Sequence, residues 1–211
     1  MRILKCSSGM DAVTKENIRA AADDIANGEL VVYPTETVYG IAADIFNERA
    51  IKNLYVTKKR PFDMPLSVAV DGKDMVENIA LMTRPVEKLI DAFLPGPLTI
   101  ITKKNPSVPD IVTSMSQKVG IRIPDNPVAI QLIKDFDGPI VATSANLHSH
   151  KDSVAIDTAV SDFGDSVSTY LDSGPCTLGK PSTIVWIMDD KVEVIRQGEI
   201  TQKQIEDVLN A

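Results

Sequence analysis

The stretch LVVYPTETVYG, residues 30–40, joins an apolar run to a polar loop. Its apolar half, Leu30–Tyr33, predicts a short buried strand that ends at the following proline. The polar half carries Thr35, Glu36 and Thr37, so that two hydroxyls flank a carboxylate at the end of a strand. These groups could grip the amine and the hydroxyl of a small ligand. Alternatively, the two threonines could bond to their own backbone in a tight turn.

Helical and extended patterns alternate outward from this stretch in both directions. Mixed order with several neighbouring strands predicts an α/β (α+β) fold, built on a twisted, mostly mixed β-sheet with flanking helices. The polar run 147–153 is expected to form an exposed loop that contains both histidines. We predict helices at 14–27, 48–58, 84–93, 127–136, 156–163 and 201–209, and strands at 30–33, 66–70, 98–102, 119–123, 140–143, 167–171, 183–187 and 192–195.

Composition excludes several classes of protein. A chain of 211 residues with 44% hydrophobic residues fits a single domain, 1–211, with a core of its own. The formal net charge of −7 argues against tight non-specific binding of nucleic acid. The two cysteines, Cys6 and Cys176, form no zinc-binding pattern. No signal peptide or membrane span is apparent, so we expect a cytoplasmic protein with reduced thiols and no contact with a membrane.

Basic residues gather where the second predicted helix ends. Lys58 and Arg60 precede Pro61, which pushes Arg60 out of the helical conformation. At such a position lysine can hold a phosphate as a point charge and arginine as a two-pronged fork. The alternative is a basic helix end that only complements the helix dipole.

Further polar groups stand at the ends of other predicted strands. Ser144 and Asn146, in TSAN (143–146), suit phosphate or ribose oxygens, or else an N-cap. Arg122 lies inside an apolar strand and therefore needs either a buried salt bridge or a bound carboxylate. Ser182 and Arg196 could add a hydroxyl and a cation to the same rim. Sequence patterns for a P-loop, a dinucleotide-binding turn and a serine-hydrolase elbow are absent. The residues alone thus predict a small-molecule site rich in hydroxyls and cations.

Taken in order, these motifs resemble the YrdC-like family of threonylcarbamoyl-AMP synthases, in its short, single-domain form. The resemblance extends from about residue 28 to residue 198, and the spacing of its pieces is more specific than any one of them. The pieces are PTETVYG (34–40), KKRP (58–61) with PL at 65–66, PGPLT (95–99), GIRIP (120–124), TSAN (143–146), PSTIV (181–185) and IRQG (195–198).

The resemblance implies an activity and a set of ligands. It implies a large, concave, positively lined cavity in which ATP, L-threonine and bicarbonate form threonylcarbamoyl-AMP, with Mg²⁺ accompanying ATP and no metal ion held by the protein alone. The product would pass to a tRNA-modifying transferase complex, with at most a weak contact to RNA. On this reading threonine is held by Thr35, Arg122 and Ser182, and the nucleotide by Lys58, Arg60, Ser144, Asn146 and Arg196, of which Lys58 and Arg60 are the catalytic pair.

One departure from the family pattern lies in the loop after TSAN, where residues 147–150 read LHSH in place of the usual Ser-Gly, so nothing is carried over from it. The other lies in the segment after KKRP, at two positions. Met64 and Ala69 stand where many members have asparagine and histidine, so no contact is carried over to either residue. The longer branch of the family also has a C-terminal domain.

Two other functions remain open at this stage. One is a non-enzymatic RNA-binding module, and the other is a carbamoyl-transfer enzyme of the hydrogenase-maturation type.

Overall fold

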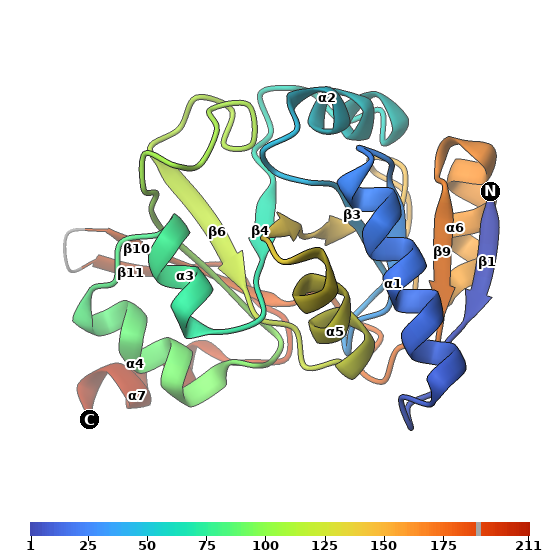
Figure 1. Cartoon of the computed structure of the whole chain (residues 1–211). Helices are drawn as coiled ribbons and strands as arrows, with labels where there is room; N and C mark the ends of the chain where they lie inside the picture. Colours follow the sequence, from blue (N-terminus) through green and yellow to red (C-terminus); the bar gives the residue numbers. More distant parts are fainter. Residues whose placement is uncertain (189–190) are drawn as a thin grey trace.

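The chain forms two mixed β-sheets, as the computed structural model shows for residues 1–188 and 191–211 (Figure 1). The first sheet has the order β1-β9-β2-β3-β8, with bounds β1 Arg2–Lys5, β9 Thr169–Asp172, β2 Val31–Tyr33, β3 Gly40–Ala42 and β8 Thr143–Ser144. The second has the order β11-β10-β5-β6-β4-β7, with bounds β11 Lys191–Arg196, β10 Thr183–Met188, β5 Leu98–Lys103, β6 Lys118–Arg122, β4 Ser67–Ala69 and β7 Ile140–Val141. Both sheets contain parallel and antiparallel pairs, as predicted.

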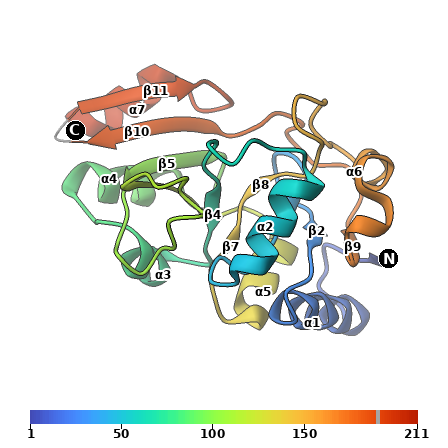
Figure 2. The same cartoon turned by 90° about the horizontal axis from the view of Figure 1, so that it is seen from above.

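Helices cover the outer sides of both sheets (Figure 2). They are α1 Ala12–Ala26, α2 Glu48–Thr57, α3 Lys73–Ile79, α4 Arg84–Phe93, α5 Pro127–Phe136, α6 Ile156–Phe163 and α7 Gln202–Asn210, with a 3₁₀ turn at Gly164–Ser166. Local capping explains where several of them begin. The side chain of Asn126 accepts the first free N–H groups of α5, and Thr201 with Gln204 forms a reciprocal capping box on α7.

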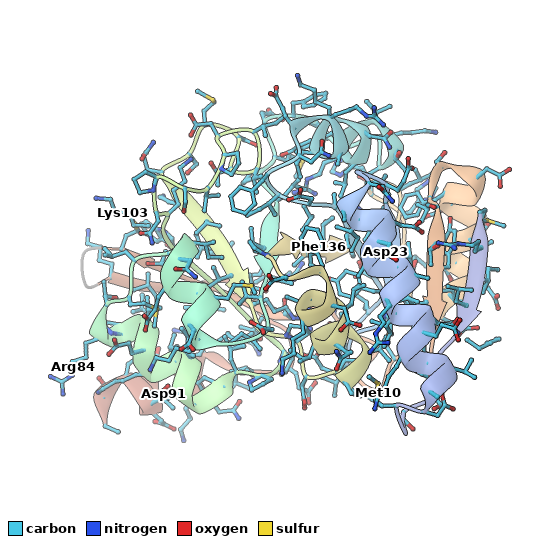
Figure 3. The ribbon with its side chains drawn as sticks, viewed as in Figure 1. Met10, Asp23, Arg84, Asp91, Lys103 and Phe136 are labelled. Atoms are coloured by element: carbon cyan, nitrogen blue, oxygen red, sulfur yellow. The ribbon has the colours of Figure 1, made fainter. Side chains whose placement is uncertain are left out.

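Helix α4 illustrates how the apolar pattern selects the buried face. Val86, Leu89 and Ile90 are buried, whereas Arg84 and Asp91 point away from the sheet (Figure 3). This is the spacing of an amphipathic helix packed on one side. Full burial of one such aliphatic side chain contributes roughly 1.5–3 kcal/mol to folding.

Helices α1 and α5 lie side by side and join the two sheets through a second apolar cluster. Ile18 and Ile25 of α1 and Leu132 of α5 are fully buried in it, together with Ala69 of β4 and Leu171 of β9. Because this cluster includes residues from both sheets, it fixes the position of one sheet relative to the other.

One predicted strand, 140–143, is divided between the two sheets. Val141 in β7 pairs with Val68 of β4, whereas Thr143 in β8 pairs with Ile41 of β3. The chain therefore crosses from the second sheet to the first at Ala142. The sequence predicted neither this crossing nor the division of the strands into two sheets.

Of the remaining predicted elements, α4, α5 and α6 have the predicted bounds, and the others have ends displaced by at most two residues. The sequence did not predict β1, β3, α3 or the 3₁₀ turn. The expectation that 147–153 is an exposed loop is wrong at its end. Ser153 is fully buried and donates a hydrogen bond to the Ala145 carbonyl at 2.5 Å, and its own carbonyl accepts the N–H of Tyr39, the residue before β3. His150 is exposed, as expected, and pairs with Asp162 at 3.0 Å.

Candidate functional site

A cavity of about 700 Å³ is lined by residues of both sheets and by the loops between them. Its floor is one face of β5, β6 and β10, and its opposite wall comes from the ends of β2, β3 and β8. Of the predicted site residues, six line it directly: Thr35, Arg60, Arg122, Ser144, Ser182 and Arg196. Met64 and Ala69, at the two positions that depart from the family pattern, also line it.

The charges on the cavity wall are mixed. Four cations line it, Arg60, Lys118, Arg122 and Arg196, together with three carboxylates, Asp63, Asp152 and Glu193. The positive lining that the resemblance implies is therefore interrupted by carboxylates. Positive charge is instead concentrated at particular points, and the geometry around each cation decides what it can bind.

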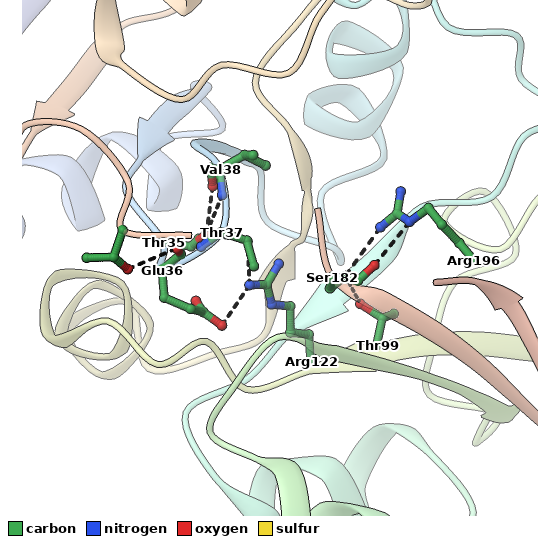
Figure 4. A network of polar contacts seen from close by, with 9 residues as sticks. Thr35, Glu36, Thr37, Val38, Thr99, Arg122, Ser182 and Arg196 are labelled. Atoms are coloured by element: carbon green, nitrogen blue, oxygen red, sulfur yellow. Dashed lines mark hydrogen bonds and ion pairs between the residues drawn. The ribbon is translucent and has the colours of Figure 1, made fainter. Parts of the chain in front are cut away.

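The loop after β2 is a closed turn held by its own hydroxyls. Thr35 Oγ1 donates to the Val38 carbonyl at 2.6 Å and lies 2.9 Å from Thr37 Oγ1 (Figure 4). A neighbouring segment also fastens this loop, because Thr177 Oγ1 and the N–H of Leu178 both donate to the Glu36 carbonyl. The tight-turn reading is therefore correct for Thr35, and the same turn presents this residue at the cavity wall.

Arg122 ends β6 and points towards this loop. Its Nη2 donates to Thr37 Oγ1 at 2.6 Å and lies 2.9 Å from Glu36 Oε1 (Figure 4). The two charged side chains are 11% and 8% exposed. Neither oxygen of Glu36 accepts a hydrogen bond of good geometry, and Nε of Arg122 has no acceptor among the described residues. The strand arginine thus has a buried carboxylate as its partner, and its Nε is too deeply buried to reach a ligand.

Ser182 and Arg196 lie together at the start of β10 and the end of β11. Arg196 donates through Nε to the Ser182 carbonyl at 3.1 Å and through Nη2 to its hydroxyl at 3.3 Å, and this hydroxyl lies 2.8 Å from Thr99 Oγ1 (Figure 4). Gly198 permits this close approach, since a Cβ there would lie 2.3 Å from the Pro181 carbonyl oxygen. The sequence pieces PSTIV and IRQG therefore form one structural unit.

Lys58 and Asn146 do not line the cavity but lie behind its wall. Lys58 is 2% exposed, and its Nζ donates to the carbonyls of Ser144 and Asn146 at 2.5 and 2.6 Å. Asn146 donates through Nδ2 to the His150 carbonyl at 2.8 Å. Burial, followed by repulsion from Arg60, lowers the pKa of Lys58 from 10.5 to about 7. Both residues therefore shape the backbone that presents Ser144.

Arg60 follows Lys58 but faces the cavity. Its Nε and Nη2 donate to the carbonyls of Met64 and Pro65 at 3.1 and 2.9 Å. Lys59 between them is exposed and adopts a left-handed conformation with φ of 50°. Because of this local turn, Lys58 lies behind the cavity wall, Lys59 is exposed and Arg60 faces the cavity.

Sequence reasoning missed two features of the site. Glu36 was considered only as a ligand-gripping group, not as the partner of Arg122. Lys118 was not considered at all, although its Nζ lies 4.4 Å from the ring centre of Trp186 and both residues line the cavity. Lys118 is four residues before Arg122 on the same strand, so the two-residue period of a strand could have placed it on the same face.

Two searches of the described residues gave negative findings. In residues 1–188 and 191–211, no group of three or more His, Cys, Asp or Glu residues is placed to hold a metal ion. In the same part of the chain, no helix is long and apolar enough to cross a membrane.

Comparison with known sequences reveals one group of relatives. A family model named Sua5/YciO/YrdC, described as telomere recombination, matches residues 23–198. A putative threonylcarbamoyl-AMP synthase of Methanocaldococcus jannaschii is 39% identical over 94% of this chain and 94% of its own length. The threonylcarbamoyl-AMP synthase of Bacillus subtilis is 35% identical over 91% of this chain, which spans 56% of that longer protein.

Solved structures give the same grouping. P. abyssi Sua5, in a crystal structure complexed with L-threonine, is 31% identical, with a TM-score of 0.94 over 99% of this chain and 61% of that one. E. coli YciO is 20% identical, with a TM-score of 0.87 over 97% of this chain and 98% of that one. The second likeness is one of fold alone. The fold extends over the whole cavity described above.

Proposed function

This chain belongs to the Sua5/YciO/YrdC family, and on that premise we propose that it is a threonylcarbamoyl-AMP synthase that uses ATP, L-threonine and bicarbonate. The observation that carries the proposal is the cavity itself. Arg122 and Thr35 both line it, and the Thr37 hydroxyl to which Arg122 donates lies 2.9 Å from that of Thr35. Ser144 and the cations Arg60 and Arg196 line the same cavity. One part suits an amino-acid carboxylate, and the other suits phosphates.

The reaction needs no protein nucleophile. Bicarbonate loses hydroxide, which takes up a proton and becomes water, and so supplies CO₂. The free amine of threonine adds to CO₂, loses a proton and becomes a carbamate. A carbamate oxygen then attacks the α-phosphorus of ATP, a new P–O bond forms, the bond to the β-phosphate bridging oxygen breaks, and pyrophosphate leaves. This is a nucleotidyl transfer, in which catalysis comes from positioning and from neutralising developing charge.

Each predicted site residue has a place in this scheme. Thr35 and Arg122 bind threonine, with Arg122 facing its carboxylate and Ser182 nearby. Arg60, Arg196 and Ser144 bind the phosphates. Lys58 and Asn146 act on the nucleotide indirectly, because their hydrogen bonds hold the backbone at residues 144–150 in shape. Lys58 is therefore proposed as a positioning residue rather than a phosphate ligand.

Mg²⁺ is proposed to enter as part of the substrate, chelated by ATP. This ion keeps several waters and is usually bound by phosphates together with one or two carboxylates. Asp63 and Asp152 lie on the cavity wall and have oxygens of the kind that Mg²⁺ prefers. When bound, the ion would neutralise charge that develops on the leaving pyrophosphate.

The remaining proposals concern the setting of the enzyme. We propose that residues 1–211 form one YrdC-like domain that acts in the cytoplasm. We also propose that its labile product passes to a tRNA-modifying transferase complex, with at most a weak contact to RNA. Three carboxylates on the cavity wall weigh against the alternative of a non-enzymatic RNA-binding groove, which would favour an uninterrupted basic stripe.

A pyrophosphate-release assay in which each component is omitted in turn tests the function. Release is expected only when ATP, threonine, bicarbonate and Mg²⁺ are present together. Release that proceeds without threonine would contradict the assignment. Release that requires carbamoyl phosphate in place of threonine and bicarbonate would instead favour carbamoyl transfer of the hydrogenase-maturation type.

A further inference from the structure

Glu36 and Arg122 form a buried pair of opposite charge at one end of the cavity. Their side chains are 8% and 11% exposed, and the atoms Oε1 and Nη2 are 2.9 Å apart. Both are satisfied only in part, because the oxygens of Glu36 accept no hydrogen bond of good geometry and Nε of Arg122 has no acceptor among the described residues. Arg122 lines the cavity, whereas Glu36 lies behind it on the fastened loop. A ligand at this end of the cavity would therefore contact Arg122, and the charges of both Arg122 and Glu36 would act on it.

The net charge of this pair constrains the ligand. Arg122 and Glu36 together are neutral, so an anion bound beside them adds one negative charge that the pair does not compensate. Such a charge is costly to bury. An α-amino acid is a zwitterion, and its ammonium group stands beside its carboxylate. It therefore adds no net charge, and its ammonium group is attracted to Glu36 while its carboxylate is attracted to Arg122. Charges in the interior are screened by salt much less than charges on the surface.

We propose that Glu36 is a specificity-determining residue, which makes this end of the cavity select a zwitterionic amino acid over a carboxylic acid that lacks the amine. This proposal rests on the proposed use of the cavity for threonine. Glu36 does this through its charge, in addition to holding the side chain of Arg122. Arg196 also lines the cavity and favours an anion, but its contribution is the same in the wild-type protein and in the Glu36 variants, and it therefore cancels when their preferences are compared.

The test compares two ligands on the same variants by calorimetric titration at neutral pH without ATP. The ligands are L-threonine and 2,3-dihydroxybutyrate, in which a hydroxyl replaces the amine. The wild-type protein should bind threonine at least about 10-fold more tightly. In Glu36→Gln this preference should fall by at least about 10-fold, equivalent to 1.4 kcal/mol. A loss of Arg122 orientation alone would weaken both ligands by the same factor, and that result would overturn the proposal.

Three controls keep the result interpretable. Glu36→Asp retains the charge and should retain the preference within about threefold of the wild-type value, and a 10-fold fall there also counts against the proposal. Glu193→Gln removes a carboxylate from the same cavity wall but on β11, three strands from β6, and should leave the preference unchanged. If neither Glu36 variant folds, the wild-type comparison still tests the proposal, because equal binding of both ligands overturns it.

Failure of the proposed function would have a different signature. In that case the wild-type protein would bind neither threonine nor its hydroxy-acid analogue, and pyrophosphate release would not depend on threonine. Failure of the present inference alone would leave threonine binding intact, with its preference unchanged in Glu36→Gln.

Discussion

Replacing Lys58 by methionine should change the stability of the protein by an amount that depends on pH. Lys58 is 2% exposed, and its Nζ donates to two backbone carbonyls, those of Ser144 and Asn146. A neutral amine has two N–H donors, which match these two acceptors, whereas an ammonium has a third. The neutral form therefore fits the site, in agreement with the direction in which burial moves the pKa.

The magnitude follows from two opposing contributions. Methionine leaves two buried carbonyls without donors, at about 1–3 kcal/mol each, so the variant is destabilised by roughly 2–6 kcal/mol when Lys58 is neutral. The folded-state pKa is about 7 and the ordinary value is 10.5, a difference of 3.5 units. At about 1.4 kcal/mol per unit, the charged form carries a penalty of up to about 5 kcal/mol. Because the carbonyl bonds also favour an ammonium, we expect less than half of this penalty, about 2 kcal/mol.

The sign follows from proton binding. Between about pH 7 and about pH 10 the unfolded state binds more protons at Lys58 than the folded state does, so stability rises with pH. Urea unfolding of the wild-type protein and Lys58→Met across this range should give a free-energy difference that grows by about 2 kcal/mol. Lys59→Met, which changes an exposed neighbour, should give a flat difference. A flat or falling difference for Lys58→Met would refute the reasoning and show that the ammonium is retained.

Three further predictions concern activity. Arg60→Ala should lower kcat/KM for pyrophosphate release by about 100-fold, or 2.7 kcal/mol, whereas Lys59→Ala should have little effect. A large loss in Lys59→Ala and a small one in Arg60→Ala would mean that the residue facing the phosphates has been misassigned. Arg122→Lys keeps the charge but loses the two-pronged geometry, so the threonine KM should rise at least about 10-fold, while the calorimetric Kd for ATP stays within about twofold. A weakened ATP Kd with unchanged threonine binding would instead place Arg122 in the nucleotide half of the cavity. Removing Mg²⁺ with a chelator should abolish pyrophosphate release, and adding it back should restore release; activity that persists without the ion would contradict its proposed role.

Local patterns in the sequence were sufficient for most of the regular elements. Helix α4 and helix α5 have apolar residues at helical spacing and a proline in the first turn, and both occur at the predicted residues, 84–93 and 127–136. Short elements were missed because they have too few residues to show a period. The strand β3 has three residues and α3 has seven. Strand β3 directly follows the polar loop after β2, which the sequence analysis identified as a candidate ligand site.

The family resemblance likewise needed only the sequence, because the order and spacing of short motifs can be recognised without knowledge of the fold. The sequence alone also predicted that Arg122 requires an anionic partner, because a charge in an apolar strand must be compensated wherever the strand lies. The tertiary structure alone decided which anion is present. Glu36 is distant in sequence and belongs to the loop of the other sheet, and no local pattern pairs the two.

The same distinction applies to Lys58 and to the strand around residue 141. The sequence determined that Lys58 and Arg60 stand at a helix end, but only the fold turned Lys58 inward to the Ser144 backbone and left Arg60 on the cavity wall. The run 140–143 has uniform strand character, yet it pairs with β4 before Ala142 and with β3 after it. Side-chain period and capping act over a few residues and can be read locally. Pairing, burial and the closure of a cavity depend on which distant segments meet, and that is settled only when the whole core packs.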